Sequence, residues 1–543
     1  MKKQHLLLTT QVALFVAILT LVSKILGLVK NQFLAAYFGT TYVTDTLNLA
    51  NAIPSMIFAG ILGATATSFV PVYSKTVEQE GDLEGNLFTS RIINLLVFIS
   101  IVSSLVGILF SRQIVTIFTM PEVAGADTGY SLSWYLSNLG WLLTHGWEGA
   151  RLELASFYVK VTFSYCLFTS VTGIIGSWLQ YKHIFIRPVI VGYILNLSVI
   201  VFILIAYHEN DPKLLVFGLF SGVIIHCIIL CIIAAKNKYH YSFDFRMTST
   251  VRKILVLAVP VFIGTTVTQI NLFVDKALAS GLREGSIAAL DFASLLITFA
   301  TGMTVGVIAM ILYPKMAKAF SLEDEPRFTE LLSAGISVLV ILGVPLTMGA
   351  LIYDGSVVKM VYLRGAFNYD SLDMTQTAFF FYSISLLPQM LAPLLINAFY
   401  SRHNTRTPLI LSCICVVINI CACLLLVGPL ALGGIALGTS IAQTIFVITL
   451  LLVLRKRITG IITRAFMVKC VKVFIASSIA VFGTLPFFLG VRILFENNGW
   501  LMPQTVMLGL TVLLAAGIYI LLLKLLKIEE LKHIRSMLNF KQG

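Results

Sequence analysis

The stretch LLVFGLFSGVIIHCIILCIIAA, residues 214–235, contains no Asp, Glu, Lys or Arg. As a helix it is long enough to cross the roughly 30 Å hydrocarbon core of a bilayer. Similar runs recur along the whole chain of 543 residues, which is 58% hydrophobic and only 12% charged. Soluble domains carry about 25% charged residues. The composition therefore excludes a soluble enzyme, a disordered protein and a disulfide-stapled secreted module, and it predicts an all-α polytopic membrane protein.

Fourteen apolar segments divide the chain, and each predicts one transmembrane helix. They cover residues 7–28, 45–70, 91–111, 155–179, 187–207, 214–235, 254–275, 287–313, 330–352, 376–400, 408–428, 431–454, 470–492 and 502–525. With the N-terminus placed in the cytoplasm, Lys and Arg are about three times more frequent in the cytoplasmic connections than in the outer ones. This bias predicts an even number of spans with both termini in the cytoplasm.

The net charge of +13 would suggest a nucleic-acid partner in a soluble protein. Here the basic residues stand in short connections between apolar runs, so membrane topology explains them and no nucleic acid is expected. The eight cysteines lie in or beside apolar runs, without the ligand spacing of a zinc site, so no metal is expected. No Gly-x-x-x-x-Gly-Lys-Ser/Thr loop is present, so neither ATP nor another cofactor is expected. Any movement of charge by such a membrane protein would be driven by the membrane potential or by a coupling cation.

An internal repeat relates two parts of the chain at an offset of 243 residues. The stretch TDTLNLANAIPSMIFAGILGATATSFVPVYSK, residues 44–75, is similar to a second stretch that ends ATGMTVGVIAMILYPKMAK at residue 318. Pro71 matches Pro314, and Lys75 matches Lys318. Six spans separate the equivalents, so both copies have the same orientation. The repeat predicts two six-helix lobes, residues 1–240 and 241–460, related by an axis along the membrane normal, followed by a helix pair and cytoplasmic tail in 461–543.

Ionisable residues inside apolar segments point to a binding site, because burying a charge in a membrane is costly. Lys24 lies within the first segment and Lys160 early in the fourth, so each should face a hydrated cavity or a carboxylate. Asp45 is the natural partner for Lys24. Lys30 and Lys276 stand at segment ends, where snorkelling to the interface is the alternative reading. Lysine binds phosphate as a point charge, so this pattern predicts a transporter of an anionic solute or head group.

Other polar features accompany these lysines. Asn271 adds an amide to the seventh segment, and Gly27 offers a bend in the first. The largest outer connection, residues 112–154, holds Trp134, Trp141 and Trp147. We expect it to form an amphipathic segment on the outer surface, with a platform for a substrate sugar as the alternative.

The motifs Ser23-Lys24-Ile25-Leu26-Gly27-Leu28-Val29-Lys30, Ala36-Tyr37-Phe38-Gly39, Thr44-Asp45, Pro54 and Ser68-Phe69-Val70-Pro71 resemble the MurJ (MviN) family of lipid II flippases, in the MOP exporter superfamily. Similar stretches follow at Leu278-Ala279-Ser280-Gly281, at Ala398-Phe399-Tyr400-Ser401-Arg402 and at Thr405-Arg406-Thr407-Pro408. The resemblance covers nearly the whole chain.

The resemblance implies a central cationic cavity between two lobes in the cytoplasmic membrane of a bacterium. Spans 13 and 14 would form a groove for a polyprenyl tail. The cargo would be an undecaprenyl-pyrophosphate-linked peptidoglycan precursor, moved from the inner to the outer leaflet by alternating access. Lys24 and Lys30 stand where the family usually has functional arginines, and Asp45 stands at its aspartate. Gly27, Gly39 and Pro54 are expected to act as gating or hinge residues.

Two departures from the family pattern leave the cargo open. The family's arginine after the span 2 proline is replaced by Ile57, and its arginine in span 8 by Leu295. An exopolysaccharide or wall-polymer repeat unit linked to the same carrier is therefore an alternative cargo. A cation-coupled small-molecule exporter of the same superfamily is another possibility, although it would call for a deep carboxylate site. A membrane glycan polymerase or ligase would need a catalytic arrangement in 112–154, which that loop lacks.

Overall fold

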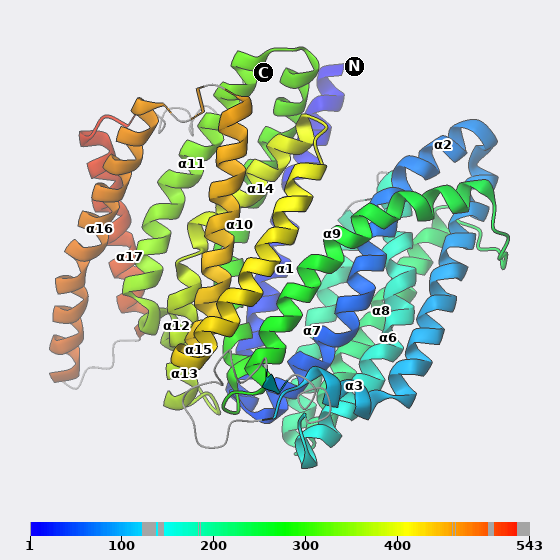
Figure 1. Ribbon diagram of the computed structural model, residues 1–543, viewed down its shortest axis with the longest axis horizontal. Coiled ribbons are helices and arrows are strands. Elements are labelled where there is room, and N and C mark those ends of the chain that lie inside the picture. The colour runs from blue at the N-terminus through cyan, green and yellow to red at the C-terminus, as the bar shows by residue number, and fades with distance from the viewer. Residues whose placement is uncertain are drawn as a thin grey trace. The chain divides into compact units, whose positions relative to one another are not determined.

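The computed structural model describes residues 2–121, 137–138, 146–182, 184, 186–458, 460–461, 463–497 and 504–528. These residues form helices and connecting turns, without a β-strand in the described ranges, so the predicted all-α class is confirmed. The chain divides into two compact units (Figure 1). Unit 1 comprises Met1–Asp291, Arg364–Ser371 and Val427–Ile435, and unit 2 comprises Phe292–Leu363, Leu372–Leu426 and Ala436–Gly543. The predicted boundary between residues 240 and 241 stays a prediction.

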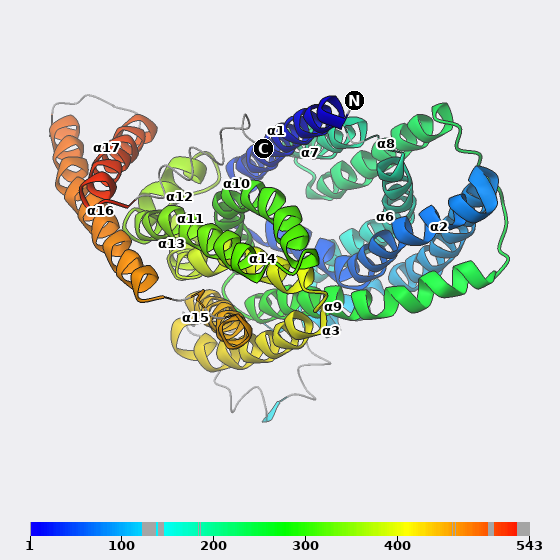
Figure 2. The ribbon, with the colours of Figure 1, turned by 90° about the horizontal axis from the view of Figure 1, so that it is seen from above.

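Unit 1 is built on one long helix, α2. Its helices are α1 (Lys2–Phe38), α2 (Tyr42–Leu109), α3 (Ser111–Phe118), α6 (Gly149–Tyr181), α7 (Ile186–His208), η1 (Pro212–Leu214), α8 (Leu215–Lys236), α9 (Ser249–Ser280) and the start of α10 (Ser286–Ser321). Both α6 and α9 pack along α2, α7 packs on α8, and α1 packs on α7 (Figures 1 and 2). Gly81, with a φ of 86°, breaks α2 between two of the predicted spans.

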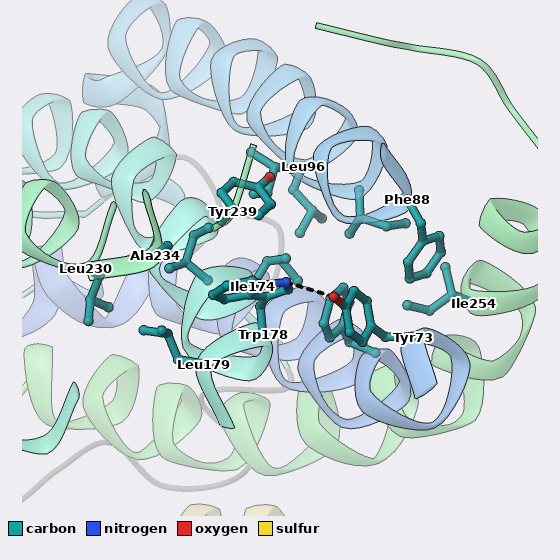
Figure 3. Packing of buried hydrophobic residues seen from close by; sticks show 14 of the residues in the cluster. Tyr73, Phe88, Leu96, Ile174, Trp178, Leu179, Leu230, Ala234, Tyr239 and Ile254 are labelled. Atoms are coloured by element: carbon teal, nitrogen blue, oxygen red, sulfur yellow. Dashed lines mark hydrogen bonds between the residues drawn. The ribbon is translucent and has the colours of Figure 1, made fainter. Parts of the chain in front are cut away.

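A core cluster joins α2, α6 and the residues after α8 (Figure 3). Trp178 is almost completely buried, and its indole N–H donates to the Tyr73 hydroxyl at 2.9 Å. The Tyr239 ring packs against Trp178 edge-on at 5.3 Å between centroids. A buried tryptophan needs such a partner for its N–H, since an unpaired donor would carry a desolvation cost.

A proline inside α2 is compensated by a side chain of α6. Pro54 lacks the backbone N–H that would bond the carbonyl of Ala50 one turn earlier. The fully buried Thr162 hydroxyl donates to this carbonyl at 2.9 Å. One turn of α6 later, the Tyr165 hydroxyl donates to the Asn51 side chain. Two adjacent hydrogen bonds therefore fix α6 against α2 at the proline.

The connection formed by residues 237–248, which we call the strap, is held to α2 by side-chain contacts. Arg91 donates to Asp244 at 2.8 Å and pairs with Glu84 at 2.5 Å. Asn94 donates to the carbonyls of Ser242 and Asp244. The backbone N–H of Arg246 and the Arg91 guanidinium lower the pKa of Asp244 below its ordinary value of 3.8.

Unit 2 contains most of α10, most of α13 (Tyr369–Ser383) and α15 (Arg406–Arg457) apart from Val427–Ile435. It also contains α11 (Glu325–Ile352), α12 (Asp354–Tyr362), α14 (Leu386–Ser401), α16 (Arg464–Asn497) and α17 (Gln504–Leu525). Both α14 and α16 pack on α11, and α17 packs on α16 and α12. Tyr353 anchors a cluster between these last three helices, and its hydroxyl pairs with Thr484 at 3.0 Å. Ala431, at a φ of 45°, breaks α15 between two predicted spans.

Ten described helices are long and apolar enough to cross a membrane, or eleven when the bent pair α13 and α14 counts as one span. Two of the helices, α2 and α15, each contain two predicted segments on either side of a backbone break. The predicted total of fourteen spans stays a prediction.

Candidate functional site

The N-terminal ends of α2 and α10 are joined by reciprocal hydrogen bonds. The Asp45 carboxylate, in the first turn of α2, accepts the backbone N–H groups of Gly285 at 2.7 Å and Ala288 at 2.8 Å. In return, Glu284 accepts the backbone N–H of Tyr42 at 2.8 Å. The first N–H groups of a helix have no partner within the helix, and its positive end favours a carboxylate. Each helix start is therefore capped by an acidic residue that belongs to the other.

The same carboxylate is paired with Arg151, at the start of α6. The Arg151 guanidinium donates to Asp45 at 2.9 Å and stacks over the Trp147 ring at 4.2 Å from the centroid. Trp147 is 3% exposed and donates its indole N–H to the carbonyl of Ser280, the last residue of α9. The predicted pairing of Asp45 with Lys24 is therefore wrong. The partner of this buried carboxylate is Arg151, whose guanidinium also stacks on the buried Trp147 ring.

The connection 112–154, expected to form an amphipathic segment on the outer surface, lies in large part outside the described residues, so this stays a prediction. Its described tryptophan, Trp147, has its ring buried between Arg151 and the end of α9. The chain cannot leave an indole N–H unpaired, and the free carbonyl at the helix end provides an acceptor. Trp134 and Trp141 lie outside the described residues.

Glycines allow the turns around Asp45 to approach closely. Gly39 ends α1 at a φ of 59°, and a Cβ there would lie 2.6 Å from the carbonyl oxygen of Ala366. Gly285 precedes α10 at a φ of 88°, and a Cβ there would overlap the carbonyl of Thr40. Both positions therefore require glycine. Gly39 is a helix-ending residue in this structure, and its predicted gating role stays a prediction.

Three charged residues from three helices lie close to the contact between the starts of α2 and α10, which we call the junction. Lys276 of α9 pairs with Asp291 of α10 at 2.6 Å, and it also contacts the carbonyl of Asn48 in α2 at 3.4 Å. Lys30 of α1 interacts electrostatically with the same carboxylate. The side chains of Lys276 and Asp291 are 19% and 33% exposed. We call Lys30, Lys276 and Asp291 the lysine cluster. It contains two lysines and one carboxylate, and the side chains of Lys276 and Asp291 remain partly accessible.

The structure does not bring all predicted lysines to this cluster. Lys24 is half-buried on α1, and among the described residues no carboxylate pairs with it. Six residues along a helix correspond to a rotation that leaves Lys24 and Lys30 roughly 120° apart around the axis. Lys24 therefore points to a different side of α1 from Lys30.

Lys160 is exposed on α6 and lines a separate pocket of about 210 Å³ with Arg112 and Glu153. None of the residues that line this pocket belongs to the lysine cluster. Asn271 is half-buried on α9, less than two turns before Lys276. The substrate-binding roles of Lys24, Lys160 and Asn271 stay predictions.

Two predicted hinges lie within continuous helix. The α1 helix runs through Gly27, where a Cβ would meet no atom closer than the Asn196 side-chain oxygen at 4.0 Å. The α2 helix runs through Pro54, with Thr162 replacing the lost hydrogen bond. Their part in gating stays a prediction.

Sequence reasoning missed Arg151 and Glu284, which hold the junction. Both stand just outside apolar segments and were assigned to outer connections. A weak signal existed for Glu284, because offset 243 aligns it with Thr41, the residue that precedes α2. Arg151 carried no such signal. In the described residues, no group of three His, Cys, Asp or Glu side chains is placed to hold a metal ion.

The family model described as "Lipid II flippase MurJ" matches residues 34–502 of this chain. The chain belongs to the MurJ family. The resemblance predicted from the motifs is thus confirmed. The family is one of transporters, and its membership together with the apolar helices makes the chain a bacterial inner-membrane protein.

Curated relatives and solved structures agree with this family. The "Probable lipid II flippase MurJ" of Rickettsia prowazekii is 27% identical over 439 residues, covering 79% of this chain and 80% of the relative. The protein of the same name from Rhizobium tropici is 25% identical over 536 residues, covering 96% and 95%. A solved "Lipid II flippase MurJ, inward closed conformation" has a TM-score of 0.77 at 21% identity, covering 95% of this chain and 100% of that one.

The fold is shared more widely. An inward-facing multidrug resistance MATE family transporter of the MOP superfamily has a TM-score of 0.66 at 12% identity, covering 81% of this chain and 95% of that one. Likeness at this level of identity concerns the fold alone.

Proposed function

We propose that this chain moves lipid II, the undecaprenyl-pyrophosphate-linked precursor of peptidoglycan, from the inner to the outer leaflet of the cytoplasmic membrane. Membership of the MurJ family supports the substrate class. The observation that carries the proposal is the lysine cluster, in which Lys276 pairs with Asp291 at a partly exposed position among apolar helices and Lys30 interacts electrostatically with the same carboxylate. A charge excess of this kind attracts a diphosphate.

In this mechanism, the diphosphate competes with Asp291 for the two lysines. Lys276 leaves its ion pair when the head group arrives, and Asp291 draws it back when the head group departs. The cluster thus binds the anion without holding it permanently, because the carboxylate always offers an alternative partner. Two lobes that alternate between inward and outward openings would then carry the head group across while the polyprenyl tail stays in lipid along α16 and α17.

The driving force follows from the charge that moves. A head group that crosses with unbalanced charge gains or loses about 2.3 kcal/mol per charge at 100 mV. We propose the membrane potential or a coupled cation as the source, with the N- and C-termini on the cytoplasmic side. The loss of family arginines at Ile57 and Leu295 favours testing a second cargo, an exopolysaccharide or wall-polymer unit on the same carrier.

The experiment is translocation by the purified full chain in proteoliposomes that contain fluorescent lipid II. K30Q/K276Q should lower the initial rate at least tenfold, because no local cation then remains to hold the diphosphate. R252Q/K253Q serves as a matched control, since it removes two exposed charges at the start of α9. An unchanged rate in K30Q/K276Q would refute the role of the cluster. Faster translocation of another carrier-linked glycan than of lipid II would instead identify the second cargo.

A substitution of Asp291 tests the proposed competition independently of the two lysines. D291N removes the competitor for Lys276 and should tighten binding of a lipid II analogue severalfold while it slows turnover. If D291N weakens binding instead, Asp291 orients the lysines and does not compete with the cargo.

A further inference from the structure

The ends of α16 and α17, the helices along which we place the polyprenyl tail, enclose a basic pocket that takes no part in the proposed binding of the diphosphate. It has a volume of about 550 Å³ and lies where α16 begins and α17 ends, two helices that pack side by side in Figures 1 and 2. Four of its lining residues are cationic, and none is acidic: Arg464, Lys469, Lys472 and Lys527. We call this the terminal basic pocket.

Two of these cations already have local partners. Lys472 donates to the carbonyl of Leu526 at 3.2 Å, so it satisfies the C-terminal end of α17. Lys469 contacts the Ser337 hydroxyl of α11 at 3.5 Å. The partner of Lys472 is a neutral carbonyl, so this lysine keeps its full positive charge at the pocket.

Arg464 and Lys527 have no such local partner. Both are exposed, and neither side chain has a hydrogen bond or ion pair to another described residue. Lys527 also adopts a φ of 54°, in the left-handed region that favours glycine. It occupies the position after a helix end where glycine is usual, and the following N–H, that of Ile528, bonds back to the carbonyl of Leu523. The chain thus places a lysine at the pocket in a backbone conformation that is unfavourable for one.

The pocket lies at the boundary of the membrane. The apolar spans run over Arg464–Val491 and Val506–Leu525, so the start of one and the end of the other both border it. The backbone N–H groups of the first turn of α16 add a partial positive charge at the same place. A pocket that combines four cations, a helix N-terminus and the membrane surface suits a phosphate group held at head-group depth.

An apolar stripe continues directly from this pocket. Val468 lines the pocket, and further exposed side chains follow along α16 at helical spacing: Val471, Ile475, Ile479 and Phe482. These positions recur every three or four residues and so share one face of the helix. A ligand with its phosphate in the pocket could lay a hydrocarbon chain along the stripe, which free phosphate could not do.

We propose that the terminal basic pocket binds the head group of an anionic phospholipid, with an acyl chain on the exposed face of α16. The site is separate from the lysine cluster and does not depend on the proposed cargo. Each Lys or Arg near a membrane surface strengthens binding of an anionic lipid about fivefold. Removing two of them should therefore weaken the interaction by roughly 25-fold.

The test is lipid titration of the purified full chain, with bound phosphatidylglycerol and phosphatidylcholine counted by native mass spectrometry. Wild type should prefer phosphatidylglycerol, and R464Q/K527N should lose that preference. Asparagine tolerates the left-handed conformation at 527, so this variant keeps the turn. The control K315Q/K318Q removes two exposed cations of α10 and should retain the preference.

Three results would overturn the proposal. One is equal binding of the two lipids by wild type. Another is full retention of the preference in R464Q/K527N. The third is displacement of phosphatidylglycerol by inorganic phosphate at equal concentration, which would make the pocket a site for the free anion. Since no translocation is measured, the result is independent of whether lipid II is the cargo.

Discussion

Asp45 and Ala288 lie 243 residues apart, and the Asp45 carboxylate accepts the backbone N–H of Ala288 at 2.8 Å. The same offset relates the two copies of the sequence repeat, so this hydrogen bond joins equivalent positions. The α2 helix begins at Tyr42 and α10 at Ser286, within one residue of that offset. The carboxylate that only the first copy carries therefore caps the helix start of the second copy.

Replacing Asp45 should destabilise the protein rather than weaken cargo binding. D45N leaves Arg151 largely buried without its anion, and breaking a buried ion pair in this way costs about 3–5 kcal/mol. Thermal unfolding of the purified chain in detergent measures the loss. The double variant D45N/R151M should unfold at a higher temperature than D45N, because it also removes the buried charge that Asp45 balances. A stable D45N with weakened lipid II binding would show that Asp45 contacts the cargo.

Substitution of alanine for three glycines, two at the junction and one within α1, should have very different effects on stability. G39A and G285A each place a Cβ against a backbone carbonyl at a positive φ, so each should lose more than about 1 kcal/mol of stability. G27A should be neutral or slightly stabilising, because the site is open and alanine favours helix. Unfolding midpoints of the three variants provide the comparison. A strong defect in G27A translocation, without a stability change, would support the predicted hinge.

The contact between Thr162 and the Ala50 carbonyl can be tested against the proline that makes it necessary. T162V leaves the carbonyl unpaired and should cost about 1–2 kcal/mol, whereas T162S should be close to wild type. In a P54A background, residue 54 regains its N–H and can bond Ala50 within the helix. T162V should then cost much less. Equal costs in both backgrounds would mean that Thr162 acts through packing alone.

The strap over α2 should respond to acid in one direction. Its Asp244 has a lowered pKa in the folded chain, so the ionised form stabilises the closed strap. This contribution is complete above the ordinary pKa of 3.8 and is lost as the pH falls through the lower, folded value. Hydrogen exchange of residues 237–248, corrected for its intrinsic pH dependence, should therefore be constant from pH 7 to pH 5. D244N should raise exchange at every pH. Increased exchange already at pH 5 in wild type would contradict this assignment.

The lengths of the apolar runs and the bias of Lys and Arg predicted the fold class, because every backbone polar group in lipid must be hydrogen-bonded within a helix. No comparable rule predicts which residue pairs with a single buried charge. Lys24 and Lys30 look equivalent in the sequence, yet helix rotation separates them, and Asp45 pairs with a residue 106 positions away. Lys30 and Lys276 were singled out as binding residues, a role that stays a prediction. The ion pair of Lys276 with Asp291, and the electrostatic interaction of Lys30 with the same carboxylate, could only be recognised once the helices were placed together.

The proline in α2 also bears on how this chain is made. The Ala50 carbonyl has its partner on α6, which is synthesised about a hundred residues later. In lipid an unsatisfied backbone carbonyl costs several kcal/mol. The first half of α2 is therefore poorly suited to enter the bilayer by itself, and its stable insertion during biosynthesis is expected to await the arrival of α6.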